Sequence, residues 1–239
     1  MLLLHGLGAS GASWGFQIPA LTAAGYHVIA PDIRGFGQSS YPGGKVTIQA
    51  LADDVGGLLQ TTCKPPAYVV GISMGGVIAL QLALDAPQLV KKLVLINTFA
   101  RLQLDRPSLW VYFGLRFILL HTLGIHAQAR AVARRIFPLP SRQALREELV
   151  REIVQSDPRG YKATMRALAR FNVLNRLSDL RMPVLVVTGE CDTTVPRAAQ
   201  NTLAQLIPGA TQVTIPDAGH GVIAEQPDLF NQTLLDFLK

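Results

Sequence analysis

The sequence predicts an α/β fold, in which a mostly parallel open sheet is flanked by helices and carries an inserted helical block. Three observations predict it. Short apolar runs alternate with longer helical patterns, as in successive βαβ units. The later runs are rich in Val and Ile, which suits strands that are buried on both faces. The stretch from residue 101 to residue 181 carries no strand signal and lies between two of the runs.

Six apolar runs are strand candidates, and most are bounded by Gly, Pro, Asp or Asn. They are Leu2–Leu4, His27–Ala30, Tyr68–Ile72, Leu93–Ile96, Val184–Thr188 and Gln212–Ile215. The segments between them predict helices over Trp14–Ala24, Thr47–Thr61, Gly75–Asp85, Ala198–Leu206 and Pro227–Leu238. Gly25 and Pro87 stand where two of these helices should end.

The block between the fourth and fifth runs is helical in pattern. Leu145, Leu149 and Ile153 repeat at intervals of four, and Ser141 precedes them as a candidate N-cap. We therefore expect one catalytic core, formed by residues 1–100 and 182–239, and a helical cap or lid inserted over residues 101–181.

Composition points to a globular chain with a large interior. Hydrophobic residues make up 49% of the 239 residues and charged residues 16%. The two cysteines, Cys63 and Cys191, suit buried free thiols better than a disulfide framework. The N-terminus has no basic region typical of a signal peptide, which predicts a cytoplasmic protein. The longest apolar stretch, Leu109–Ile125, contains Arg116 and is too short to span a bilayer.

Positive charge is concentrated in the helical block. Residues 101–181 contain fifteen Lys and Arg against six Asp and Glu. Such a block could attract an anionic substrate or lipid headgroups, or it could be a solvated helical surface, which is the interpretation we favour. No nucleic-acid-binding module is apparent.

The strongest local motif is Gly71-Ile72-Ser73-Met74-Gly75. It follows the apolar run Tyr-Val-Val-Gly and opens an apolar helix, which is the context of a nucleophile elbow. Such a turn holds the serine in a strained conformation and lifts its hydroxyl clear of the sheet. We predict Ser73 as a nucleophile.

A serine hydroxyl needs a base within hydrogen-bond reach. Of the five histidines, His220 is the best candidate, because it follows the last strand and precedes the final helix. A loop there can return it to the elbow. His27, His121 and His126 are more simply explained as structural residues.

The imidazole in turn needs a carboxylate to fix its tautomer. Asp192 follows the penultimate strand and gives the chain order Ser, Asp, His. Glu190 and Asp217 are its rivals, the latter being too close in sequence to His220 to reach behind the ring. An oxyanion hole would use backbone N–H groups, for which we choose Leu7, in the glycine-rich loop after the first strand, and Met74.

These motifs together resemble the α/β-hydrolase superfamily, almost from end to end. The segment Ala30–Ser39 looks like the family's loop after its fourth strand, and Thr188–Pro196 and Gly219–Gly221 look like its acid and histidine loops. The resemblance implies Ser73, Asp192 and His220 as catalytic triad, Leu7 and Met74 as oxyanion donors, and a lid over the acyl pocket. It implies no metal and no organic cofactor. Relatives that use aspartate at the elbow, such as haloalkane dehalogenases and epoxide hydrolases, are disfavoured by Ser73.

One departure from the family concerns the start of the sheet. Family members usually have two strands before the His-Gly strand, whereas this chain begins inside that strand. We therefore expect about six strands, with His27–Ile33 as an exposed edge. An open edge predicts homodimerisation through that strand or reduced stability. A truncated start is an equal explanation.

Three functions follow from these residues. The first is a carboxylic-ester hydrolase that acts through an acyl-enzyme on a small-molecule substrate. Apolar residues of the cap, including Trp110, Tyr112, Phe113 and Phe117, favour an apolar acyl group, or simply pack the cap on the core. The second is a hydrolase of enol-lactones, acyl lactones or carbon–carbon bonds. The third is a non-catalytic ligand-binding relative.

Overall fold

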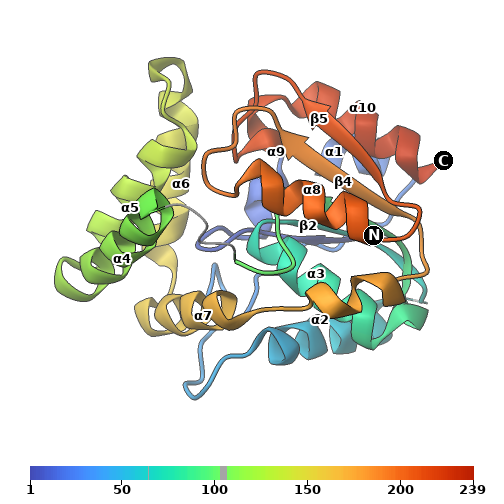
Figure 1. The fold of residues 1–239 in the computed structure, drawn as a ribbon, viewed down its shortest axis with the longest axis horizontal. Coiled ribbons are helices and arrows are strands. Elements are labelled where there is room, and N and C mark those ends of the chain that lie inside the picture. The colour runs from blue at the N-terminus through green and yellow to red at the C-terminus, as the bar shows by residue number, and fades with distance from the viewer. Residues whose placement is uncertain (64, 103–106) are drawn as a thin grey trace.

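The computed structural model describes residues 1–63, 65–102 and 107–239, with the backbone alone for residues 107–110, 112 and 113. Five parallel strands form one sheet in chain order. They are β1 (Leu2–Leu4), β2 (Ala67–Ile72), β3 (Val90–Ile96), β4 (Val184–Gly189) and β5 (Thr211–Ile215). The predicted parallel α/β architecture is therefore confirmed (Figure 1).

The sixth predicted strand, His27–Ala30, is reduced to a single bridge between Leu2 and Ile29 beside β1. The Leu3 N–H donates to Ile29 O at 2.9 Å, and the Ile29 N–H donates to Met1 O at 2.8 Å. Extending this pairing would need an N–H from residue 31, which is proline and has none. The ladder therefore stops after one bridge.

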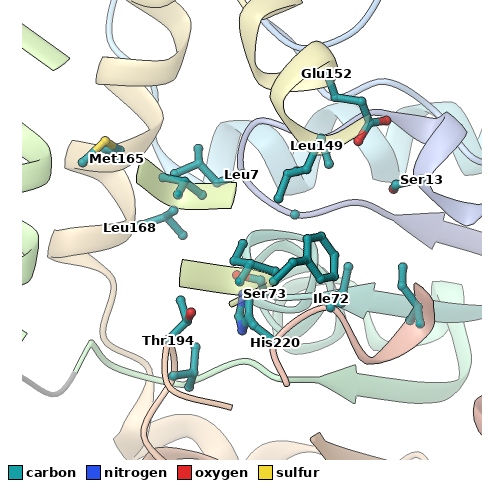
Figure 2. Close-up of a pocket in the computed structure, with 18 of the residues that line it drawn as sticks. Leu7, Ser13, Ile72, Ser73, Leu149, Glu152, Met165, Leu168, Thr194 and His220 are labelled. Atoms are coloured by element: carbon teal, nitrogen blue, oxygen red, sulfur yellow. The ribbon is translucent and has the colours of Figure 1, made fainter. Parts of the chain in front are cut away.

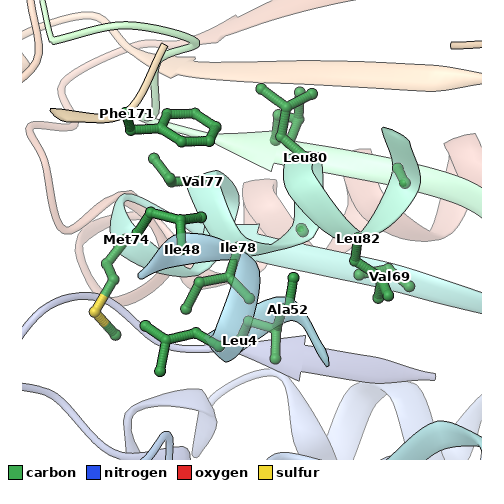
Figure 3. Packing of buried hydrophobic residues seen from close by; sticks show 14 of the residues in the cluster. Leu4, Ile48, Ala52, Val69, Met74, Val77, Ile78, Leu80, Leu82 and Phe171 are labelled. Atoms are coloured by element: carbon green, nitrogen blue, oxygen red, sulfur yellow. The ribbon is translucent and has the colours of Figure 1, made fainter. Parts of the chain in front are cut away.

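Helices cover both faces of the sheet, because alternate residues of its strands point to opposite faces. One buried cluster joins Leu2 and Leu4 to α2 (Ile48–Thr62), α3 (Met74–Asp85) and α8 (Arg197–Leu206). Figure 3 shows part of it, with α3 packed between α2 and the strands. A second cluster joins Leu3 to α1 (Ile18–Ala23), α9 (Val222–Glu225) and α10 (Pro227–Leu238).

Two predicted helix starts are wrong. The helix expected over Trp14–Ala24 is split into a 3₁₀ turn, Gly11–Trp14, and α1, which starts just before Pro19. Proline favours a helix start because its missing N–H would be unpaired there anyway. Ser141 is not an N-cap: Pro140 opens a 3₁₀ turn, Pro140–Arg142, and the next helix begins at Gln143 without a side-chain cap.

Four α-helices lie between β3 and β4 and occupy one side of the molecule in Figure 1. They are α4 (Pro107–Thr122), α5 (Gly124–Ile136), α6 (Gln143–Gln155) and α7 (Pro158–Arg170). A short 3₁₀ helix, Leu174–Asp179, leads from them to β4. Three aromatic residues of the cap were predicted to favour an apolar acyl group. Their side chains lie outside the described part of the structure: Trp110, Tyr112 and Phe113.

Candidate active site

Ser73 occupies the sharp turn between β2 and α3. Its backbone has φ 54° and ψ −115°, a left-handed conformation that costs a serine about 1–3 kcal/mol. The surrounding structure fixes this turn with two hydrogen bonds. The Ser73 N–H donates to Ile96 O at 2.9 Å, and the Thr98 hydroxyl donates to Ser73 O at 2.7 Å.

The glycines on either side of Ser73 leave no room for a side chain. A Cβ at Gly71 would lie 2.3 Å from Gly75 O, and a Cβ at Gly75 would lie 2.0 Å from Leu4 O. Both distances are far below van der Waals contact. The turn can therefore be this tight only because both residues are glycine.

His220 follows β5 and is hydrogen-bonded to Asp192, which follows β4. The His220 Nδ1 lies 3.0 Å from Asp192 Oδ2, and the Asp192 side chain is only 1% exposed. The same carboxylate accepts the N–H groups of Thr194 at 2.7 Å and Val195 at 3.1 Å, and the Gln200 amide at 3.2 Å. A carboxylate with these partners orients the ring with Nδ1–H as donor and leaves Nε2 available.

The rival carboxylates are placed differently. Glu190 and Asp217 are exposed, and the Glu190 carboxylate accepts the Asp217 N–H at 3.4 Å. His27, His121 and His126 are exposed on the surface. Ser73 and His220 therefore line one cavity and His220 is bonded to Asp192, whereas the Glu190 and Asp217 side chains, although also near the carboxyl ends of β4 and β5, are exposed.

The loop after β1 lies against Ser73. A Cβ at Gly6 would lie 3.7 Å from the Ser73 Cβ, and Leu7 lines the same cavity as Ser73. Met74 is the first residue of α3, so its N–H has no acceptor within the helix. Both predicted N–H donors thus belong to segments next to the serine.

His5 braces this loop, a role that sequence reasoning did not assign. Its Nε2 accepts the Ile33 N–H at 2.9 Å, so its Nδ1 carries the proton and donates to Gly6 O at 2.8 Å. Complete burial lowers the pKa of His5 from 6.5 to about 4. The ring is therefore neutral and is held by two backbone groups.

Asn97 and Glu225 hold the histidine loop, and neither was predicted. The Asn97 amide donates to Gly219 O at 3.0 Å and His220 O at 2.9 Å, and its oxygen accepts the Gly189 N–H at 2.8 Å. Glu225, also buried, accepts the Gly219 N–H at 2.8 Å. Burial raises the pKa of Glu225. The one sequence signal was an asparagine directly after a strand, a residue that tolerates the φ of 45° seen here.

A cavity of about 700 Å³ contains Ser73 and His220 in its wall (Figure 2). Most of the remaining wall is apolar, and α4 to α7 supply much of it. Representative apolar residues are Leu7, Ile72, Val132, Phe137, Leu149, Met165, Leu168 and Ile223. The predicted repeat of Leu145, Leu149 and Ile153 thus turns its first two members to the cavity, while Ile153 is fully buried.

The charged residues of the cavity wall come from α4, α6 and α7. Arg116, buried on α4, donates to the Tyr161 hydroxyl at 2.8 Å. Arg166 and Arg170 of α7 also reach the wall, as do Glu148 and Glu152 of α6. The other arginines of α5, α6 and α7 are mainly exposed or half-buried, as a solvated helical surface requires.

Within residues 1–63, 65–102 and 107–239, no three His, Cys, Asp or Glu side chains are grouped to hold a metal ion. In the same described part of the chain, no helix combines the length and apolarity needed to cross a membrane. Cys63 and Cys191 are free thiols; Cys191 is exposed and Cys63 half-buried, so the expected full burial is wrong.

The parallel sheet and the serine turn define an α/β-hydrolase architecture. The chain belongs to the α/β-hydrolase fold family, whose model matches residues 1–227. A Caulobacter sp. (strain K31) relative named "Putative carbamate hydrolase RutD" is 32% identical, and the alignment covers 100% of this chain and 90% of the relative.

Solved structures are similar over nearly the whole chain. The enol-lactonase from Burkholderia xenovorans LB400 has a TM-score of 0.90 and 32% identity, with 99% of this chain and 90% of that chain covered. A thermophilic esterase from Thermogutta terrifontis has a TM-score of 0.85 and 29% identity, with 99% and 88% covered.

Proposed function

We propose that this protein is a serine hydrolase that cleaves carboxylic esters through an acyl-enzyme. The observation that carries the proposal is the arrangement of three residues. Ser73, in a strained turn, shares a cavity with His220, whose Nδ1 is bonded to the buried Asp192 carboxylate. Membership of the α/β-hydrolase family supports it.

In the proposed mechanism, Ser73 Oγ attacks the ester carbonyl while His220 Nε2 takes its proton. Asp192 holds the ring and stabilises the imidazolium that forms. The N–H groups of Leu7 and Met74 bind the oxyanion of the tetrahedral intermediate. His220 then gives its proton to the leaving alcohol, activates a water molecule and so releases the acid from Ser73.

The cavity favours a small to medium apolar acyl group. Its wall is mainly aliphatic and aromatic, and α4 to α7 form one side of it. We propose that these helices act as a lid that keeps water from the acyl-enzyme except at the hydrolytic step. Exclusion of water also strengthens every electrostatic interaction inside the cavity.

A second candidate keeps the serine chemistry but changes the substrate to a lactone or a ring-cleavage product. Arg116, Arg166 and Arg170 in the cavity wall favour it, because lactones that carry a carboxylate would meet positive charge there. The similarity to a solved enol-lactonase is in line with this candidate.

The first experiment is hydrolysis of p-nitrophenyl esters from acetate to palmitate, with Ser73→Ala as the control. We expect the variant to lose activity by several orders of magnitude. The preferred chain length then reports the depth of the pocket. A folded wild type that hydrolysed none of these esters, yet opened lactones, would replace the first candidate by the second.

A further inference from the structure

Glu152 places a carboxylate in the wall of the mainly apolar cavity. It lies on α6, and the Ser10 hydroxyl donates to its Oε1 at 2.6 Å. Ser10 belongs to the loop after β1, which also contains Leu7. Figure 2 shows Glu152 and Ser13 along the same side of the pocket, with Met165 and Leu168 of α7 on the other side. The carboxylate is thus held in a fixed place within the pocket that contains Ser73.

Burial raises the pKa of Glu152, and the negative charges of Glu148 and Asp32 raise it further, against the hydrogen bond from Ser10. Glu148 is exposed and paired with Arg151. The cavity's arginines belong to other helices: Arg116 on α4, and Arg166 and Arg170 on α7.

These arginines have contacts of their own. Arg116 bonds to Tyr161, and Arg166 stacks on the Phe117 ring at 5.9 Å. Beside Glu152, the charges of Glu148 and Asp32 add to a negative environment, although the helical block as a whole is basic.

We propose that Glu152 selects the acyl group: it accepts a hydrogen bond from an amide, hydroxyl or ammonium group on the acyl chain and disfavours a carboxylate there. This inference rests on the proposed ester hydrolysis. An ionised carboxylate is only an acceptor, with about four lone-pair sites, and Ser10 occupies one. A carboxylate on the substrate could offer no donor and would add a second negative charge in a poorly solvated place.

The test compares two p-nitrophenyl esters of the same size. One carries glutarate, with a terminal carboxylate, and the other glutaramate, with a terminal carboxamide; the pentanoate ester is the apolar reference. The wild type should have about tenfold or higher kcat/KM for glutaramate than for glutarate at pH 8. In Glu152→Gln this ratio should fall about tenfold, while kcat/KM for pentanoate changes less than about threefold.

Glu147→Gln is the matched control, because it removes the same charge from the same helix at an exposed side chain that is not among those lining the cavity. It should change the ratio by less than about twofold. The preference of the wild type for glutaramate should grow with rising pH, as Glu152 ionises, and should be flat in Glu152→Gln. An equal effect of both variants, or a wild type that prefers glutarate, would refute the selection.

Failure of the proposed function gives a different result. If the wild type hydrolysed none of the three esters, ester cleavage would be refuted, and the selection would be decided by calorimetric binding of glutaramate against glutarate. Tighter binding of glutaramate, reduced in Glu152→Gln, supports the inference; equal binding overturns it.

A stability measurement checks that Glu152 titrates inside the fold. Folding favours the protonated form of a carboxyl group whose pKa is raised, so its contribution to stability decreases as the pH rises. The Tm of Glu152→Gln relative to wild type should therefore increase as the pH rises above the ordinary glutamate pKa of 4.5. A constant difference in Tm would contradict a buried, titrating carboxylate.

Discussion

The loops at the ends of the strands and the helix α4 both line the cavity, but they differ in hydrogen bonding and exposure. The loops are fixed by directional bonds: Asn97 alone makes three side-chain hydrogen bonds to two loops. The described surface of α4 instead exposes large apolar side chains, with Val111 59%, Leu115 59% and Ile118 56% exposed. The candidate residues Asp192 and His220 thus lie on loops that are fixed by directional bonds, whereas α4 exposes apolar side chains next to the proposed acyl site.

The largest effect is expected from a change in the hydrogen bond between Asp192, in the loop after β4, and His220, in the loop after β5. Asp192→Asn should lower kcat by about 10⁴-fold, because an amide in this place favours the wrong tautomer of His220. Steady-state kinetics with a p-nitrophenyl ester measures it, and circular dichroism verifies the fold. A loss of less than about tenfold would mean that Asp192 is not the partner of the base.

Asn97→Ala tests the hydrogen bonds by which Asn97 joins the histidine loop to the end of β4. It removes three hydrogen bonds and leaves the Gly189 N–H and two carbonyl groups unpaired, so we expect about 3 kcal/mol of lost stability. Urea unfolding measures this loss. Asn97→Asp is the matched control, since it can still accept the Gly189 N–H but cannot donate to the histidine loop.

If these hydrogen bonds position His220, kcat must fall by more than the loss of folded protein explains. Asn97→Asp should lower kcat more than it raises KM and should change the pH profile of kcat/KM, which a purely structural role would leave unaltered. An unchanged kcat in a folded Asn97→Asp protein would contradict a role of Asn97 in positioning His220.

The pH dependence of stability tests the role of His5, which holds the loop after β1. Its pKa is about 4 in the folded protein against 6.5 in the unfolded chain, so folding favours the neutral ring. This contribution to stability is complete above about pH 6.5 and is lost as the pH falls toward 4, by about 3 kcal/mol. Urea unfolding at pH 7 and pH 4.5 measures it. His5→Gln should lose less stability between these pH values than wild type; an equal loss would assign the effect to other groups.

The smallest effect is expected on α4. Leu115→Gln replaces an exposed apolar side chain and should change the free energy of unfolding by less than about 0.5 kcal/mol. Thermal unfolding measures it, with Leu120→Gln, a buried position on the same helix, as the control that should cost several times more. A large loss in Leu115→Gln would show that α4 packs more firmly than its exposure indicates.

Much of the fold was readable from the sequence. The five strands were placed within three residues at each end, because apolar runs bounded by Gly and Pro identify buried parallel strands. The sixth predicted strand, His27–Ala30, forms only one bridge. Pairing of parallel strands needs a backbone N–H donor at every second residue, and Pro31 has none. Ser73, Asp192 and His220 could be predicted as site residues because their loops carry recognisable patterns at the ends of three strands.

The sequence by itself determined the α/β class, the chain order of the three candidate residues and the position of the helical block. Only the tertiary structure decided that Asn97 holds the histidine loop, that His5 braces the loop after β1 and that Glu152 enters the cavity. These side chains meet partners far away in the chain, 123 residues for Asn97 and His220 and 142 for Ser10 and Glu152. Local pattern cannot encode such pairs, because they depend on the order of strands in the sheet and on how α6 packs over it.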